Sequence, residues 1–251
     1  MKRILKGFVF VALLLAVFSI APTVQAQIPE LVIGIGTDAD TLNPQEQTTS
    51  LMINMVELLY DTLFYQNAEG KLESRLATKF DVSKDGLTYT LHLRKDVKFS
   101  DGTPFDAKVM KLTVDRALDP KMSVPQRSQI NMIKESKIVD DYTIELVLSY
   151  PFAPFMPTLS MFILSPISPA AIQKYGEDVR QNPVGAGPYV LKEWVKGDRI
   201  VFTRNPTYYG QKPTVEKLTF KIVPETATRE AMLRASSNRG LRPNLTFPRM
   251  G

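Results

Sequence analysis

The side chains that most often perform catalysis are scarce in this sequence. It has 251 residues, a single histidine (His92) and no cysteine. The lack of cysteine excludes disulfides, thiolate metal sites and cysteine nucleophiles. One histidine cannot build a His-rich metal site, and it leaves few Ser/His arrangements possible. His92 lies in an alternating segment that predicts a strand, on the side expected to face solvent, and we assign it no function.

One segment matches a loose form of the dinucleotide-binding pattern. Gly34-Ile-Gly36 follows an apolar run, as that fingerprint requires. The fingerprint must then open a helix whose N-terminus holds the pyrophosphate. Pro44 follows closely and favours a loop instead. We therefore predict no cofactor, no metal ion and no enzymatic activity, with a secreted enzyme of unknown chemistry as the alternative.

The first 26 residues have the pattern of a cleavable signal peptide. Three positive residues precede an eleven-residue apolar run from Phe8 to Phe18, and Val24 and Ala26 are the small residues expected before a cleavage site. The alternative, a membrane anchor, needs about 20 consecutive apolar residues, and polar residues interrupt this run too soon. The pattern predicts cleavage after Ala26 and a periplasmic mature protein.

The net charge of +5 is concentrated at the two ends of the chain. Residues 27–228 carry 23 Lys and Arg against 25 Asp and Glu, a net charge of −2. A chain of this kind presents no basic face that would hold phosphates by counterion release. We therefore predict no nucleic-acid partner.

The hydrophobic pattern predicts an α+β (mixed α/β) fold. Apolar or alternating runs predict strands, and segments with helical spacing predict helices that begin near residues 50, 107 and 225. Hairpins dominate the middle of the chain. The expected strands lie at 30–37, 88–94, 137–139, 142–148, 189–195, 199–204 and 215–223.

Four segments together resemble the extracytoplasmic solute-binding proteins, family 5, which serve importers of oligopeptides, dipeptides and nickel. They occur in the order and spacing of that family between about residues 31 and 235. The segments are the first strand followed by Asp40-Thr-Leu-Asn-Pro44, the region from Ala77 to Pro104, Asn182-Pro-Val-Gly-Ala-Gly-Pro-Tyr189, and Glu193 to Tyr209.

The resemblance implies a periplasmic binding protein-like fold of type II and a two-lobe binder that closes on its ligand. It implies a peptide or other small solute as ligand and the membrane permease of an ABC transporter as partner; we expect a monomer. Strands on either side of the middle region predict a first-lobe core from residues 27–60 and 183–235. Residues 61–182 are then an inserted α+β subdomain.

The chain departs from the family in its length and in its last residues. Family members are roughly twice as long, and the match ends near Ala235. Residues 236–251 lack helical or strand periodicity, which predicts either a frayed terminus or a tail that is not native to the fold. These observations together favour a truncated first lobe, with a non-functional gene remnant as an alternative.

The resemblance maps ligand binding onto Thr48, Thr49 and Ser50. In the family, the segment after the Leu-Asp/Asn-Pro turn lines the cleft of the first lobe. Hydroxyl and backbone groups there could bond an extended ligand backbone. The alternative is that these residues cap the helix that begins near Ser50, and both roles are compatible.

Overall fold

The computed structural model describes residues 30–237 of the chain, so the predicted signal peptide (1–26) and residues 238–251 lie outside it. The chain combines helices with largely antiparallel sheets, as in an α+β fold, which confirms the predicted class. The strands are β1 Glu30–Ile35, β2 Phe64–Gln66, β3 Leu72–Ser74, β4 Ala77–Val82, β5 Thr88–Leu93, β6 Ile133–Asp140, β7 Thr143–Leu148, β8 Tyr189–Val195, β9 Arg199–Arg204 and β10 Lys217–Ile222. The α-helices are α2 Ser50–Leu59, α3 Ala107–Leu118, α4 Phe155–Thr158, α5 Pro169–Tyr175 and α6 Thr226–Ser237, with short 3-10 turns η1 Arg127–Gln129, η2 Phe162–Leu164 and η3 Gly176–Arg180.

The first and last strands of the described residues, β1 and β10, lie side by side in one sheet of order β1-β10-β9-β8. β1 runs parallel to β10, with Glu30 opposite Lys217 and Ile35 opposite Ile222. β8 and β9 form the hairpin that the sequence predicts, joined at residues 196–198. Strands from the two ends of the described residues therefore share one sheet, although about 150 residues separate the end of β1 from the start of β8.

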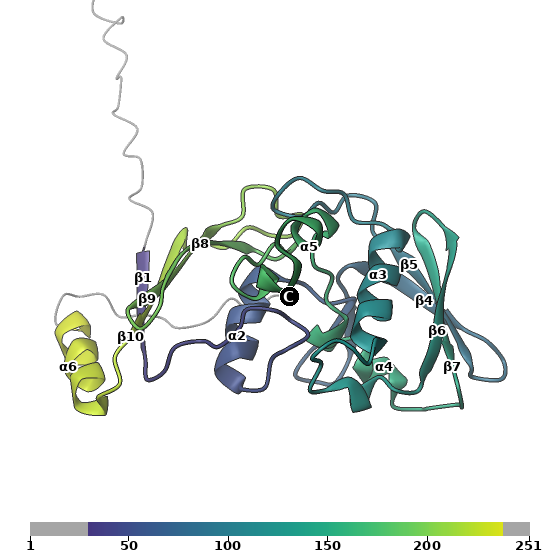
Figure 1. The fold of residues 1–251 in the computed structure, drawn as a ribbon, viewed down its shortest axis with the longest axis horizontal. Helices are drawn as coiled ribbons and strands as arrows, with labels where there is room; N and C mark the ends of the chain where they lie inside the picture. Colours follow the sequence, from purple (N-terminus) through teal and green to yellow (C-terminus); the bar gives the residue numbers. More distant parts are fainter. Residues whose placement is uncertain (1–29, 238–251) are drawn as a thin grey trace, which may run out of the picture.

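The intervening residues form a second, antiparallel sheet of order β4-β5-β7-β6. In β5, Tyr89, Leu91 and Leu93 are buried and the residues between them are partly exposed, as the alternation predicts. β6 is longer than the expected strand, since it begins at Ile133 rather than Lys137. The two larger sheets lie toward opposite ends of the molecule, with α2 and α3 between them (Figure 1).

Each large sheet has its own hydrophobic core. The first core joins the β4–β7 sheet to α3, and its fully buried side chains include Leu91, Met110 and Ile144. The second core joins the β1–β10 sheet to α2 through residues such as Val56 and Phe202. Burial of this apolar surface is the main favourable term that holds each part together.

The predicted division at residue 182 remains a prediction. Strands of residues 27–60 and 183–235 do share a sheet, but α5 lies within the part assigned to the inserted subdomain. Its Ala171 packs in the core of the β1–β10 sheet. At the other end, α6 continues to Ser237, so the first two residues of the predicted tail are helical.

Three of the segments that carry the family resemblance meet between the two sheets, at the C-terminal end of α2. The backbone N–H of Gly187 donates to the carbonyl oxygen of Leu59, the last residue of α2, at 2.9 Å. The backbone N–H of Ser100 donates to the carbonyl oxygen of Gly185 at 3.0 Å. Asn205, which is fully buried, donates from Nδ2 to the Gly187 carbonyl oxygen at 2.8 Å. The glycine-rich loop therefore approaches α2, and not a ligand, at these positions.

Gly34 and Gly36 leave space for a side chain that crosses β1. The Arg229 side chain of α6 lies over both residues, 3.5 Å from the position a Cβ would take at Gly34 and 3.2 Å at Gly36. Its Nη1 donates to the carbonyl oxygens of Val223 and Pro224 at 2.6 and 2.7 Å. Arg229 thus holds α6 against β1.

Candidate functional site

Thr48, Thr49 and Ser50 are exposed and lie at the N-terminus of α2. Thr49 is the N-cap residue, and its Oγ1 accepts a hydrogen bond from the backbone N–H of Met52 at 3.3 Å. The capping alternative is therefore confirmed for Thr49, while Ser50 is the first residue of the helix. The hydroxyl hydrogen of Thr49 remains able to donate to a ligand.

A compact polar network fixes the loop that leads into this segment. Asn43 Nδ2 donates to Glu46 Oε1 at 2.9 Å, and Asn43 Oδ1 accepts from the backbone N–H of Gln45 at 3.0 Å. The backbone N–H of Leu42 donates to the carbonyl oxygen of Arg180 at 2.8 Å. Since Leu42, Asn43 and Gln45 are buried, the loop holds the start of α2 in one place.

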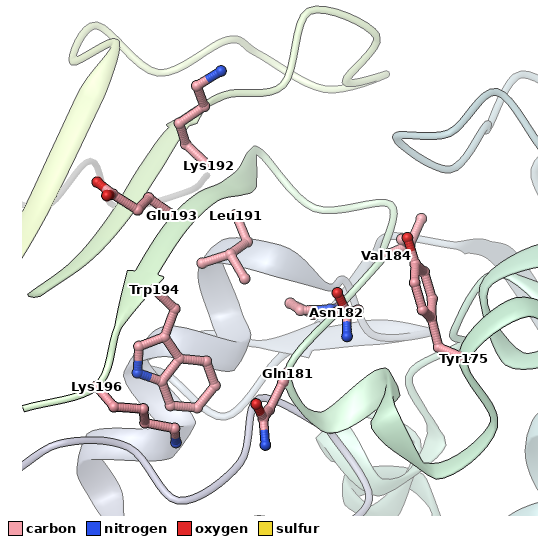
Figure 2. Close-up of a pocket in the computed structure, with 10 residues that line it drawn as sticks. Tyr175, Gln181, Asn182, Val184, Leu191, Lys192, Glu193, Trp194 and Lys196 are labelled. Carbon is pink, nitrogen blue, oxygen red and sulfur yellow. The ribbon is translucent and has the colours of Figure 1, made fainter.

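A pocket of about 450 Å³ opens between β8 and the segment that follows η3. Figure 2 shows Leu191 and Trp194 on one side and Tyr175 on the other, with Lys192 and Glu193 directed away. Gln181 and Asn182 supply amide groups along the edge between them. Thr48, Thr49 and Ser50 are not part of this pocket.

The wall of this pocket is fixed by Asp38. Trp194 Nε1 donates to Asp38 Oδ1 at 3.0 Å, and the backbone N–H of Gly197 donates to Oδ2 at 2.8 Å. Lys196 Nζ lies 3.5 Å from the centroid of the Trp194 ring, a cation–π contact, and donates to the carbonyl oxygen of Ala39 at 3.2 Å. Sequence reasoning missed this role because an Asp in a turn usually bonds only its neighbours.

The Asp61 carboxylate, two residues after the end of α2, contacts two tyrosines. The hydroxyl groups of Tyr208 and Tyr209 both donate to Asp61 Oδ2, at 3.3 and 2.5 Å. Burial raises the pKa of Asp61, and the tyrosine hydrogen bond only partly offsets this effect. Arg94 lies 4.8 Å from the centroid of the Tyr209 ring. The shared carboxylate thus gives the two tyrosines a part-buried polar contact.

His92 pairs with a carboxylate on the neighbouring strand, where its Nε2 lies 2.9 Å from Asp81 Oδ2. The hydrogen bond from His92 lowers the pKa of Asp81. Within residues 30–237 there is no cluster of three His, Asp or Glu side chains that could hold a metal ion. No helix in that described range is both long and apolar enough to cross a bilayer.

The family is decided by a match over most of the chain. The model of the bacterial extracellular solute-binding proteins, family 5 Middle, matches residues 71–238. The chain belongs to this family. Because its structural neighbours have the same arrangement, its α+β fold is that of type II periplasmic binding proteins, as the resemblance implies.

Three relatives illustrate the range of this family. The glutathione-binding protein GsiB of Escherichia coli O1:K1 is 35% identical over 205 residues, which are 81% of this chain and 40% of the relative. The structure of NikA from Brucella suis in complex with Fe(III)-EDTA is 30% identical, with a TM-score of 0.74 and coverage of 82% of this chain and 42% of that one. The periplasmic binding protein DppA from Helicobacter pylori, in complex with the peptide STSA, is 29% identical, with a TM-score of 0.75 and coverage of 83% and 45%.

The chain therefore spans less than half the length of the relatives it matches. The family to which it belongs is one of solute-binding proteins. Residues 30–70, which precede the matched range, contain β1 and the predicted ligand-binding segment.

Proposed function

We propose that this chain supplies the first lobe of a solute-binding protein for ABC-type uptake, and that its ligand is a short peptide. The observation that carries the proposal is membership of solute-binding family 5, together with the names of similar proteins. Those names include a glutathione-binding protein and a binding protein in complex with a tetrapeptide. Glutathione is itself a tripeptide, so both ligands offer amide groups and terminal charges.

The proposal extends to partners and location. The mature chain acts in the periplasm after removal of residues 1–26, delivers its ligand to a membrane permease and works as a monomer. It has neither a catalytic role nor a nucleic-acid partner. Residues 27–60 and 183–235 form the lobe core, and residues 61–182 form the inserted subdomain.

In this proposal the ligand binds at Thr48, Thr49 and Ser50. The three residues are exposed at the N-terminus of α2, so a ligand can reach their hydroxyl and backbone groups. A net contribution of about 0.5–1.5 kcal/mol for each hydrogen bond gives at most about 4.5 kcal/mol. Binding by this chain alone is therefore expected near 1 mM or weaker, since 1 mM corresponds to about −4.1 kcal/mol.

An NMR titration of the purified chain tests the binding segment directly. Glutathione and mixed di- to pentapeptides should shift the backbone amide signals of Thr48, Thr49 and Ser50 at millimolar concentrations. Thr48→Ala should reduce the shifts without loss of stability, because the Thr48 hydroxyl makes no capping bond. Thr214→Ala is the matched control at another exposed threonine. Shifts that are absent, or confined to residues around Trp194, would contradict the proposal.

Thr49 needs a separate pair of variants because it caps the helix. Thr49→Ser keeps a hydroxyl that can cap α2 and also reach a ligand, so binding and stability should both persist. Thr49→Ala should lower the free energy of unfolding by about 1 kcal/mol as well as weaken binding. Comparison of the two variants separates the capping role from the binding role.

A further inference from the structure

Several buried side-chain polar atoms have no hydrogen-bond partner among the residues that the structure describes. They come from four segments: the loop before α2 (residues 42–47, the α2 N-terminal loop), the residue that follows α2, helix α3 and the residue after η2. The atoms are Gln45 Oε1, Gln47 Oε1, Tyr60 OH, Arg116 Nε and Nη2, and Ser165 Oγ. Tyr60 and Ser165 are 1% and 0% exposed, so bulk water does not reach them.

The side-chain amide of Gln45 connects three of these segments. Gln45 Nε2 donates to the carbonyl oxygen of Thr113 at 3.0 Å and contacts that of Ile163 at 3.4 Å. Thr113 lies one turn before Arg116 on α3, and Ile163 lies two residues before Ser165. The side chain of Gln45 therefore lies between α3, which carries Arg116, and η2, which ends one residue before Ser165.

Helices α2 and α3 both contact η2, so Tyr60, Arg116 and Ser165 lie on or beside neighbouring elements. Burial raises the pKa of Tyr60, the Arg116 guanidinium lowers it, and the Glu46 carboxylate raises it. Burial also lowers the pKa of Arg116, and the carboxylates of Glu46 and Glu177 oppose this effect only in part. Glu46 forms an ion pair with Arg180, at 3.5 Å.

The mixture of donors and acceptors identifies the kind of molecule that these atoms can bind together. The Arg116 nitrogens can only donate, the Gln45 and Gln47 oxygens can only accept, and the two hydroxyls can do both. A cation would face the guanidinium, and an anion would face the amide oxygens and nearby Glu46. Water can accept from the arginine and donate to the amides, and buried water typically makes about three such bonds.

We propose that Gln45, Tyr60, Arg116 and Ser165 enclose an internal hydration site whose water molecules bridge the α2 N-terminal loop to α3. These bridges hold the loop that leads to Thr48, Thr49 and Ser50. This last consequence rests on the proposed function, whereas the hydration site itself does not. An unpaired buried hydroxyl would destabilise the fold, and bridging water removes that cost.

A crystal structure of the chain, at a resolution that shows ordered solvent, is the first test. Water molecules are expected at hydrogen-bond distance, about 2.7–3.2 Å, from both Tyr60 OH and Arg116 Nη2. An interior in which Arg116 contacts Glu46 directly, with no solvent between the four side chains, would overturn the proposal. A bound ion in place of water would overturn it as well.

Thermal unfolding of two conservative variants is the second test. Tyr60→Phe should lower the Tm by about 2–4 °C, because a bridging water loses a partner. Ser165→Ala should also lower the Tm. Tyr150→Phe and Ser123→Ala are the matched controls, since both wild-type residues are exposed, and they should leave the Tm unchanged. An unchanged or raised Tm for Tyr60→Phe would show that no water molecule bridges Tyr60, and would overturn the proposal. Neither test uses a ligand, so the results do not depend on whether the chain binds peptides.

Discussion

Trp194 Nε1 donates a hydrogen bond of 3.0 Å to Asp38 Oδ1, across 156 residues of sequence. The same carboxylate accepts from the backbone N–H groups of Ala39 and Gly197, both at 2.8 Å. One side chain therefore fixes the loop after β1 to the hairpin of β8 and β9. Trp194 is also the single tryptophan of the chain, so the tryptophan fluorescence comes from the surroundings of this contact.

Asp38→Ala should destabilise the protein and change the tryptophan emission. The substitution leaves two N–H groups of other segments without their acceptor, and hydrogen bonds to a charged group contribute about 1.5–3 kcal/mol each. Because Asp38 is only half-buried, water replaces part of the lost bonding, and we expect the free energy of unfolding to fall by about 2–3 kcal/mol rather than by the full sum. Urea unfolding followed by the fluorescence of Trp194 measures both effects.

Asp40→Ala is the matched control for that substitution. Asp40 is exposed and lies two residues further along the same loop. It should change the free energy of unfolding by no more than about 0.5 kcal/mol, as for other surface substitutions. Equal losses for the two variants would mean that the contact between Asp38 and Trp194 contributes no specific stability.

Gly185→Ala should be strongly destabilising. A Cβ at this position would lie 2.0 Å from the Leu59 carbonyl oxygen and 2.6 Å from Tyr60 Cδ1, so the loop would have to move away from α2. We expect a loss of about 3 kcal/mol or more in urea unfolding. At Gly34, the nearest atom to an added Cβ is Arg229 Cγ at 3.5 Å, an ordinary contact. Gly34→Ala should therefore be nearly neutral, and a similar loss at both positions would contradict the prediction.

Asp61→Asn should gain stability relative to the wild type as the pH rises. Burial raises the pKa of Asp61 above its ordinary value of 3.8, so the folded protein binds this proton more tightly than the unfolded chain does. Ionisation of Asp61 therefore destabilises the wild type, beginning near the unfolded pKa and complete above the raised folded pKa. Asparagine does not ionise, and it still accepts from Tyr209. Urea unfolding of both proteins from about pH 3 to pH 7 measures the difference.

Asp85→Asn gives the opposite trend and serves as the control for Asp61. The hydrogen bond from the Ser83 hydroxyl lowers the pKa of Asp85. Its ionised form therefore favours the folded state above the unfolded pKa, and that contribution is lost as the pH falls through the lowered folded pKa. A pH-independent difference for Asp61→Asn would show that Asp61 is not the buried carboxyl group described above.

Arg229→Ala should release α6 from β1. The Arg229 side chain supplies the bonds to the carbonyl oxygens of Val223 and Pro224, and it covers Gly34 and Gly36. We expect faster amide hydrogen exchange in residues 226–237, with no change in the β4–β7 sheet. Arg234→Ala is the control on the same helix, because the Arg234 side chain is 83% exposed. Equal acceleration in both variants would contradict the proposed role of Arg229.

Local patterns in the sequence account for most of the helices and strands. The apolar spacing after Ser50 predicts α2, and Asp119-Pro120 predicts the end of α3 at Leu118. The alternation of Tyr89, Leu91 and Leu93 predicts the buried face of β5. These predictions succeed because side chains alternate across a strand and recur every 3.6 residues on a helix, whatever the rest of the chain does.

The sequence by itself determined the α+β class, the order of the elements and the family, because local periodicity and ordered motifs are properties of the chain. Only the tertiary structure decided which groups meet: Asp38 with Trp194, Gly185 with Leu59, and Asp61 with Tyr209. In each of these pairs the partners lie more than 120 residues apart, and no local pattern encodes such a contact. Their meeting depends on parallel pairing of β1 with β10 and on the packing of α2 between the sheets, which only the folded chain brings about.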